Sequence, residues 1–549
     1  MPMAQSVARA GAGPLGDEPA FVLGDHVQSH RELAARAAAV AAGLRSVPAL
    51  SRTWLPSGTR LLAIGTGNHR VFAELFTGAT AGDGVCAVLD PQWGTERTRA
   101  VLDRLRPDLL VLSAGQKGTR EAAGELGIRT LTAGDFAPGV YADGSGVRGG
   151  EPVTPGEVTP VDGLSSYETW LAEWAGADPA GHLVPGDDLA PFLVGFTSGS
   201  TGLPTAFHRS RRSWRISLAE GRKVWGMDEG QRTLAPGPLA HGLSLYALAE
   251  CLESGAAFHG LPSFDAPAIL REPSTAWARR LIVVPTMLTA LCSAAADFGA
   301  QEAARHLASV RTVVSGGAKL PQRLLGPVAA LLPRARVLEY YGASELGFVT
   351  VGSSGHATGP RDVGTAFPGV SLEVRDAQGA PVPPGTTGTV HVRTPLRCDG
   401  YVWGEGSFRQ DGEWATVGDI GQLTEDGHLH LTGRGGMVIT GGLNVYPSEV
   451  ENALSRLEGI ETALVTSVPD DYLGQALVAV VTGAAAGLGQ SALRELCAAA
   501  LPRYQVPRRF YTLATWPLTS SGKVARGRIE EWIAHEDARL VPLPGLSRE

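Results

Sequence analysis

Short apolar runs alternate with helical stretches through the first part of the chain, and this alternation constrains the fold more than any other feature. The apolar runs span residues 61–64, 85–89 and 109–112, and helical patterns at 71–81 and 96–105 separate them. Strands that alternate with helices in this way form a parallel sheet that the helices cover. The sequence therefore predicts an α/β fold.

Other segments carry local signals of their own. Residues 29–45 keep helical spacing, with Ser29 as the N-cap and Glu32 completing a capping box. Residues 137–163 are rich in Gly and Pro and have no period, which is typical of a long surface loop. From Val370 onward the pattern changes to the alternation of β-hairpins.

The length of the chain predicts more than one domain, because 549 residues exceed the usual size of a single hydrophobic core. Residues 1–433 are expected to form a large domain of helix-covered β-sheets with a β-subdomain. Residues 434–549 are expected to form a smaller α+β unit, with a helix at 447–457, a strand at 463–468 and a closing helix at 491–501.

Composition argues against several classes of protein. A net charge of −8 argues against a nucleic-acid partner recognised by bulk electrostatics. The five cysteines have no C-x-x-C spacing, so neither a disulfide framework nor a structural zinc site is expected. Residues 1–20 lack the apolar core of a secretory signal, and no run of about eighteen apolar residues suggests a membrane helix. We expect a cytoplasmic protein with no integral membrane contact.

The strongest local motif is P-F-L-V-G-F-T-S-G-S-T-G-L-P-T at residues 191–205, where a buried strand runs into a loop of small residues. Glycines and small hydroxyl residues let backbone N–H groups surround phosphate oxygens, although the same composition also suits a flexible turn. The loop is not that of P-loop NTPases, because no G-x-x-x-x-G-K-[ST] occurs. The predicted phosphate-binding residues are Thr197, Ser198, Gly199, Ser200, Thr201 and Gly202.

The T-S-G-S-T-G run resembles the phosphate loop of the adenylate-forming superfamily, which includes acyl-CoA synthetases, firefly-type luciferases and peptide-synthetase adenylation domains. Downstream, E-Y-Y-G-A-S-E-L-G looks like the superfamily's Y-G-x-[ST]-E element. The resemblance implies that Tyr341 stacks on adenine, in a nucleotide site that also includes Tyr340 and Gly342. It further implies that Ser344 contacts the α-phosphate and that Glu345 binds a Mg²⁺ ion bridging ATP oxygens. Without the resemblance, Glu345 would be read as a surface carboxylate.

More motifs follow in the superfamily's order. Asp419 in W-A-T-V-G-D-I-G and Arg434 in L-T-G-R-G-G match the pair that holds the ribose hydroxyls. P-L-T-S-S-G-K-V-A-R places Lys523 where the superfamily keeps a lysine that bridges the substrate carboxylate and the α-phosphate. S-G-G-A-K-L resembles the turn that lies against adenine, which implies nucleotide contacts from Gly316, Gly317 and Ala318.

The segment 435–451 resembles the superfamily's hinge and the hairpin that lines the pantetheine tunnel, which implies roles there for Gly436, Gly441, Gly442 and Leu443. The acyl pocket implied by the same motifs includes His241, Ser315, Gly316, Gly347 and Phe348. Together these matches cover nearly the whole chain. They imply a mobile C-terminal cap that closes for adenylation and rotates for thioester formation, in an acyl-CoA ligase that uses ATP, Mg²⁺ and coenzyme A.

The phosphate loop departs from the superfamily's pattern. It usually continues as G-x-P-K-G, but here Thr205 and Ala206 follow Pro204, so the usual cation is missing. Losing one electrostatic stabiliser costs about 10²- to 10³-fold in rate, which predicts weakened adenylation. Three nearby arginines could compensate or could instead form a solvated helix start: Arg209, Arg211 and Arg212.

The hinge also departs, because Gly436 stands where Asp or Lys is common and Gly435 precedes it. Two glycines widen the accessible backbone angles, which predicts easier rotation of the cap.

Two related functions stay open beside the full ligase. The missing loop lysine motivates an enzyme that only transfers to coenzyme A an acyl-adenylate made by a separate enzyme, although the retained Lys523 weighs against it. An enzyme that loads a carrier protein is the other, but no carrier domain follows Lys523. The Phe264-Asp265 pair is not placed to hold a substrate ammonium, and Asp265 is expected to cap the helix through Leu270. The retained polar residues argue against a noncatalytic scaffold.

Overall fold

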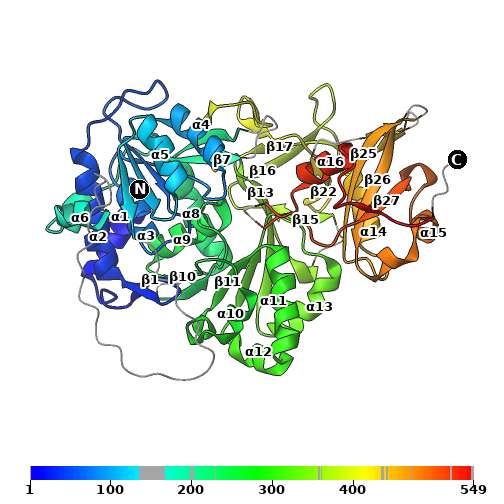
Figure 1. The fold of residues 1–549 in the computed structure, drawn as a ribbon, viewed down its shortest axis with the longest axis horizontal. Coiled ribbons are helices and arrows are strands. Elements are labelled where there is room, and N and C mark those ends of the chain that lie inside the picture. Colours follow the sequence, from blue (N-terminus) through cyan, green and yellow to red (C-terminus); the bar gives the residue numbers. More distant parts are fainter. Residues whose placement is uncertain are drawn as a thin grey trace. The chain divides into compact units, whose positions relative to one another are not determined.

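The chain divides into two compact units. Figure 1 labels its helices and strands. A computed structural model describes residues 2–134, 167–197, 203–228, 230–356, 359, 361–434, 438–440, 443–470, 473–519 and 522–545. The first unit comprises Met1–Val283, Arg305–Thr312 and Pro395–Gly406, and the second comprises Val284–Ala304, Val313–Thr394 and Ser407–Glu549. The loop predicted at 137–163 lies outside the described residues.

A seven-stranded sheet in the first unit has the order β18-β8-β7-β4-β3-β5-β6. Its five strands from β7 to β6 pair in parallel, whereas β8 and β18 pair antiparallel. This confirms the predicted parallel sheet. The strands are β3 (Leu61–Gly65), β4 (Val85–Val88), β5 (Leu109–Ser113), β6 (Thr130–Ala133), β7 (Pro191–Thr197), β8 (Thr205–Ser210) and β18 (Gly400–Trp403).

Apolar side chains from one face of this sheet form a core with a helix that connects its strands. Leu61, Ala63, Val85 and Ala87 pack there with Val101 and Leu102 of α4. The capping box predicted for α2 is confirmed, since Ser29 Oγ accepts from Glu32 N at 3.2 Å and Glu32 Oε2 accepts from Ser29 N at 2.9 Å. The helices of this part are α1 (Pro2–Ala12), α2 (His30–Ser46), α3 (Phe72–Ala79), α4 (Thr95–Leu105), α5 (Lys117–Glu125), α6 (Tyr167–Ala172) and α7 (Pro179–His182).

A second sheet of the first unit runs in the order β11-β9-β10-β1-β2. Asp265 caps α10 as predicted, with its carboxylate accepting from Ala268 N at 2.9 Å. The strands are β1 (Pro19–Leu23), β2 (His26–Ser29), β9 (Arg232–Leu234), β10 (Ala257–Gly260) and β11 (Arg280–Val283), and the helical segments beside them are α8 (Arg211–Trp225), α9 (Gly242–Ser254), α10 (Ala266–Arg271) and η1 (Pro273–Trp277).

The second unit contains a largely antiparallel sheet in the order β19-β20-β17-β21-β22-β15-β14-β13-β12, with β16 paired to β17. The predicted hairpin is confirmed, because β16 and β17 pair antiparallel from Ser371↔Arg393 to Arg375↔Thr389. The strands are β12 (Thr312–Ser315), β13 (Arg336–Ala343), β14 (Gly347–Ser353), β15 (Asp362–Ala366), β16 (Ser371–Arg375), β17 (Gly388–Arg393), β19 (Arg409–Asp411), β20 (Trp414–Thr416), β21 (Asp419–Leu423) and β22 (His428–Arg434).

The last part of the second unit has a core of its own around Val450, Val465 and Phe510. Its helix α14 ends at Leu454, three residues before the predicted end, and α15 does not close the chain, because β27 and α16 follow it. The elements here are β23 (Val438–Thr440), β24 (Leu443–Val445), α14 (Pro447–Leu454), β25 (Thr462–Asp470), β26 (Gly474–Thr482), η3 (Ala484–Leu488), α15 (Gln490–Ala500), η4 (Arg503–Gln505), β27 (Arg509–Thr512), α16 (Arg526–Ala534) and β28 (Val541–Pro542). The remaining helices of the unit are α11 (Pro285–Phe298), α13 (Gln322–Leu331), η2 (Ser354–His356) and most of α12 (Ala300–His306).

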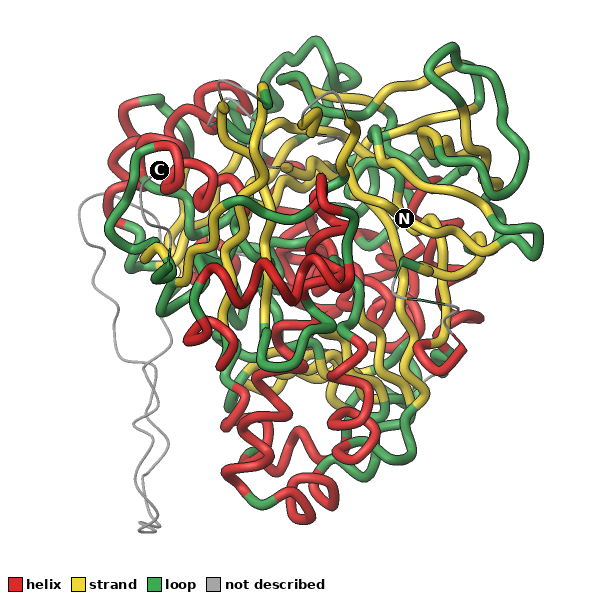
Figure 2. Tube along the Cα trace, turned by 90° about the vertical axis from the view of Figure 1, so that its right-hand side faces the viewer, coloured by secondary structure: helices red, strands yellow, loops and turns green. Residues whose placement is uncertain are grey.

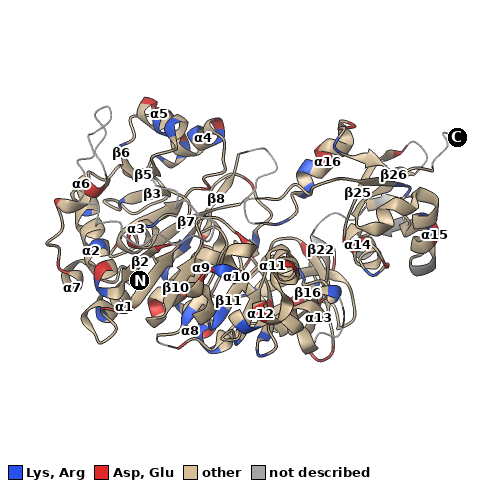
Figure 3. Ribbon diagram, turned by 60° about the horizontal axis from the view of Figure 1, so that its bottom comes forward, with Lys and Arg blue, Asp and Glu red and all other residues tan. Residues whose placement is uncertain are grey.

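Figure 2 colours the helices and strands of the described residues. Within the described part of the chain, no helix combines the length and apolarity needed to cross a bilayer. All five cysteines are free thiols, and four of them are buried. Both signs of charge lie on α4 and α5 (Figure 3), where Arg99 pairs with Glu125 at 2.8 Å. That mixture is typical of a solvated face.

Candidate active site

The predicted phosphate loop comes between β7 and β8 in the chain, and these two strands form a hairpin. Thr197 is the last residue of β7 and pairs with Thr205, the first residue of β8. Residues 198–202, which carry the predicted Ser198, Gly199, Ser200, Thr201 and Gly202, lie outside the described residues. The hairpin is held by aromatic packing, since the Phe196 ring lies 5.2 Å from that of Trp93 and 6.0 Å from that of Trp403.

Thr205 occupies the place of the usual lysine, and its side chain is packed inward with only 3% of its surface exposed. A Cβ added to Gly404 would lie 2.8 Å from Thr205 Oγ1, so the backbone at Gly404 rests against this threonine. The indole of Trp403 donates to the Pro204 carbonyl at 3.0 Å. The threonine that replaces the superfamily's lysine is therefore part of the packing around the hairpin.

The arginines at the end of β8 and directly after it are not equivalent. Arg211 has no exposed surface and donates to the carbonyls of Pro191 at 2.7 Å and Gly84 at 2.7 Å. Arg209 is buried and donates to the Leu396 carbonyl. The prediction of a solvated helix start was wrong for these two, because their guanidinium groups satisfy carbonyls that would otherwise be buried without a donor. Arg212 is exposed, as predicted.

A turn after β12 carries the S-G-G-A residues in the second unit. Ser315 ends β12 and is fully buried. Gly317 has φ of +87°, a backbone angle that favours glycine, and Ala318 follows it. A Cβ added to Gly316 would lie 2.3 Å from the ring of Tyr340, so only a glycine allows the turn to approach β13 this closely.

A buried carboxylate ties this turn to β13, and the sequence alone did not single it out. Glu339, 6% exposed, accepts from Lys319 Nζ at 3.0 Å, from Leu320 N at 2.9 Å and from Ser354 Oγ at 2.6 Å. Lys319 directly follows Ala318, and Glu339 directly precedes Tyr340. The ion pair therefore fixes one predicted nucleotide-contacting segment against the other. The feature of the sequence that could have indicated this ion pair is the presence of one lysine and one glutamate in the two neighbouring motifs.

Strand β13 brings the predicted adenine and ribose residues together. The Tyr341 hydroxyl donates to the Asp419 carboxylate, although the two residues are 78 positions apart in the chain. Asp419 begins β21 and faces Arg434 of β22 as its Cα partner in the sheet register. Gly342 allows a close approach, since a Cβ there would lie 2.4 Å from the Gly347 carbonyl oxygen.

Ser344 and Glu345 lie in the short connection between β13 and β14. The Glu345 side chain is only 5% exposed. Within the described residues, no three His, Cys, Asp or Glu side chains gather into a metal-binding cluster. A single buried carboxylate is the donor set suited to Mg²⁺ that takes its remaining ligands from phosphate oxygens and water.

The predicted acyl-pocket residues belong to both units. In the second, the Phe348 ring meets Tyr340 edge to face at 4.7 Å and stacks on Phe367 at 4.9 Å, and Gly347 precedes it with φ of +76°. In the first unit, His241 is the N-cap residue of α9, with Nε2 at 3.5 Å from Asp90 Oδ2. The Phe348 ring is therefore held between two aromatic neighbours.

Lys523 lies against the turn that carries Gly317. A Cβ added to Gly317 would be 2.6 Å from Lys523 Cε and 3.2 Å from its Nζ. The lysine is held by a tight turn, in which Thr519 N donates to the Lys523 carbonyl at 2.6 Å and Lys523 N donates to Thr519 Oγ1 at 3.1 Å. The structure thus places this amine beside the predicted adenine segment. Of the predicted hinge and tunnel residues, Leu443 begins β24, whereas Gly436, Gly441 and Gly442 lie outside the described residues.

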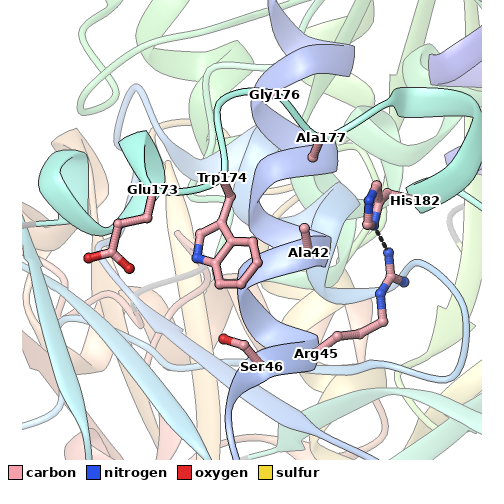
Figure 4. A pocket seen from close by; sticks show the side chains of 8 residues that line it. All are labelled: Ala42, Arg45, Ser46, Glu173, Trp174, Gly176, Ala177 and His182. Atoms are coloured by element: carbon pink, nitrogen blue, oxygen red, sulfur yellow. Dashed lines mark hydrogen bonds between the residues drawn. The ribbon is translucent and has the colours of Figure 1, made fainter.

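A cavity of about 470 Å³ lies elsewhere in the first unit, between α2 and the segment that leads to α7 (Figure 4). Arg45 and His182 meet by a hydrogen bond at one side of it, and the Trp174 ring lies at another. Burial, followed by the charge of Arg45, lowers the pKa of His182. None of the predicted site residues lines this cavity.

Comparisons with known proteins identify the family of the chain. Residues 8–402 match the AMP-binding enzyme family, and residues 449–523 match the AMP-binding enzyme C-terminal domain. The chain is 32% identical over 490 residues to an uncharacterised acyl-CoA ligase, YhfT, of Bacillus subtilis, covering 87% of this chain and 90% of that one. It is 33% identical over 335 residues to a putative long chain fatty acid-CoA ligase, VraA, of Staphylococcus epidermidis, covering 61% and 69% of the two chains.

Among solved structures, the ATP-bound MatB of Rhodopseudomonas palustris matches with a TM-score of 0.79 at 24% identity, over 97% of this chain and 99% of that one. At this identity the match shows a shared fold.

Proposed function

The chain belongs to the AMP-binding enzyme family as an acid–thiol ligase of the acyl-CoA synthetase type, and from this premise we propose that it performs both half-reactions of an acyl-CoA ligase. In the first, a carboxylate attacks the α-phosphorus of ATP, giving acyl-AMP and releasing pyrophosphate. In the second, the thiol of coenzyme A attacks the acyl carbon and AMP leaves. The first step makes the carboxyl group electrophilic before the thiol arrives.

The position of Lys523 is the observation that carries this proposal. Its amine lies beside Gly317, in the same unit as the Tyr341–Asp419 pair. A cation there would stabilise the charge that develops when the carboxylate attacks phosphorus. The retained lysine weighs against an enzyme that only accepts ready-made adenylate.

The proposed roles of the other residues follow the same layout. Tyr341 would stack on adenine while its hydroxyl orients Asp419, and Asp419 and Arg434 would hold the ribose hydroxyls. Glu345 would hold Mg²⁺ when the ion arrives with ATP, and the ion would neutralise phosphate charge. Ser344 and the residues 197–202 would contact phosphate oxygens. The acyl pocket would include His241, Ser315, Gly316, Gly347 and Phe348.

We propose residues 1–433 as the nucleotide- and acyl-binding domain and 434–549 as a mobile cap that brings in the thiol. Gly436, Gly441, Gly442 and Leu443 would form its hinge and the pantetheine tunnel. The separate core around Val450 and Phe510 supports a cap that keeps its own fold while it moves.

The second candidate is an enzyme that transfers a preformed adenylate without making one. Thr205 favours it, because the buried hydroxyl supplies no cation where the superfamily has a lysine. The cost of one missing stabiliser, about 10²- to 10³-fold in rate, would still leave measurable adenylation.

Two parallel assays separate these candidates. The purified protein is given ATP and Mg²⁺ with malonate, benzoate, dodecanoate or hexadecanoate in turn, and pyrophosphate release is followed. The synthetic acyl-adenylate of each acid is mixed with coenzyme A in the second assay, and thioester is measured. Pyrophosphate release with one acid, followed by its thioester, is the expected result. Thioester from preformed adenylate alone would reject the full ligase in favour of the second candidate.

A further inference from the structure

The turn that presents Lys523 rests on the first residues of helix α11. The Thr286 hydroxyl donates to the Gly522 carbonyl at 2.7 Å. A Cβ added to Gly522 would lie 3.4 Å from Val284 Cγ2 and 3.7 Å from Met287 Cε, which are ordinary contact distances. Gly522 is therefore hydrogen-bonded to Thr286 and faces a small seat made by Val284, Thr286 and Met287.

The seat is rigid because it is the first turn of a helix. Pro285 occupies the first helical position, and the amides of Met287 and Leu288 donate to the Val284 carbonyl at 3.0 and 3.2 Å. Leu288 is fully buried and anchors this turn. The Thr286 hydroxyl is consequently held at a defined position rather than carried on a loop.

The turn that carries the lysine is also organised by its own hydrogen bonds. Gly522 N donates to the Thr519 carbonyl at 2.9 Å, and Lys523 N donates to Thr519 Oγ1 at 3.1 Å. A hydrogen bond to the Gly522 carbonyl therefore acts on the residue next to the lysine, whose amine lies beside Gly317. Holding Gly522 therefore fixes the backbone from which the Lys523 side chain extends toward Gly317.

We propose that Thr286 is a positioning residue for the ATP-dependent half-reaction, which docks the turn of Lys523 beside the adenine segment. This inference rests on the proposed function. When the cap rotates for thioester formation, the bond from Thr286 to Gly522 breaks. Thr286 therefore contributes to adenylation and not to the transfer of the acyl group to coenzyme A.

The kinetic test compares three variants on the acid of the panel that releases pyrophosphate fastest. Thr286→Val keeps the shape but loses the donor, Thr286→Ser keeps the donor, and Thr289→Val is the matched control. The Thr289 hydroxyl donates to the Pro285 carbonyl at 3.0 Å within the same helix, away from the lysine.

We expect Thr286→Val to slow pyrophosphate release by about 2- to 10-fold, the value of one ordinary hydrogen bond, with the serine variant and the control near wild type. Thioester formation from the synthetic adenylate should be unchanged in all three. Equal slowing of both half-reactions by Thr286→Val would mean a general structural defect and would overturn the proposal. So would an unchanged rate of pyrophosphate release.

A second readout needs no substrate. Trypsin cleaves after Lys523 when the turn leaves its seat, so the cleavage rate at this bond follows the undocked population. Thr286→Val should be cleaved there about 2- to 10-fold faster than wild type or Thr289→Val, as scored by mass spectrometry. If no acid releases pyrophosphate but cleavage is accelerated, the proposed function fails while the docking role of Thr286 stands. Equal cleavage of all proteins would reject the docking role.

Discussion

Replacing Gly317 by alanine tests whether Lys523 must lie beside the adenine segment. The new Cβ would come 2.6 Å from Lys523 Cε, 3.2 Å from its Nζ and 3.6 Å from Val284 Cγ1. The lysine tip is the flexible partner in this clash, so we expect the amine to move away while the turn keeps its place.

Two costs of Gly317→Ala can be separated. A non-glycine residue at φ of +87° destabilises the fold by about 1–3 kcal/mol, which urea unfolding would measure. Displacing the amine removes one electrostatic stabiliser, so pyrophosphate release should fall by about 10²- to 10³-fold. Thioester formation from synthetic adenylate should fall far less, because the lysine takes no part in it.

Gly379→Ala is the matched control for the loss of stability that a non-glycine residue causes at positive φ. Gly379 has φ of +83°, and no heavy atom lies within 4 Å of a Cβ built on it. It should lose similar stability without losing adenylation. If the two variants released pyrophosphate at the same rate, the reasoning that ties Lys523 to this position would be refuted.

Three further predictions concern other described residues. Tyr341→Phe removes the donor to Asp419 and should raise the KM for ATP by about 2- to 10-fold; an unchanged KM would argue against a ribose role for this pair. Thr205→Lys should not speed adenylation, because the side chain of residue 205 is buried against Gly404, and the variant should unfold at a lower urea concentration. Faster pyrophosphate release by this variant would contradict the reasoning. Burial lowers the pKa of His259 from its ordinary 6.5 to about 4. As the pH falls from 6.5 to 4, the unfolded chain therefore binds a proton that the folded chain does not, and the free energy of unfolding declines by on the order of 3 kcal/mol. His259→Gln should flatten that part of the pH profile of unfolding free energy, and an unaltered profile would contradict the assignment.

Local sequence patterns predicted helix caps and strands well where these depend on interactions between residues a few positions apart. The Ser29 capping box and the Asp265 cap have partners three residues away, so both could be read from the sequence. The buried parallel strands were predicted for a similar reason, because apolar runs and intervening helices admit few arrangements. The same reading misjudged Arg211, whose fully buried guanidinium depends on carbonyls brought in from β4 and β7 regions of the chain.

The order of motifs along the chain determined which residues to consider, and from them the family and the class of reaction. Only the tertiary structure decided how they meet. It joined Tyr341 to Asp419, locked Glu339 onto Lys319, packed Thr205 beneath Gly404 and seated Gly522 on Thr286. These contacts link segments that are separated in the sequence, and they form only when the complete sheets and turns pack against one another. A periodicity or a motif describes a residue's immediate neighbours, whereas the position of a charge in a folded site depends on every element packed around it.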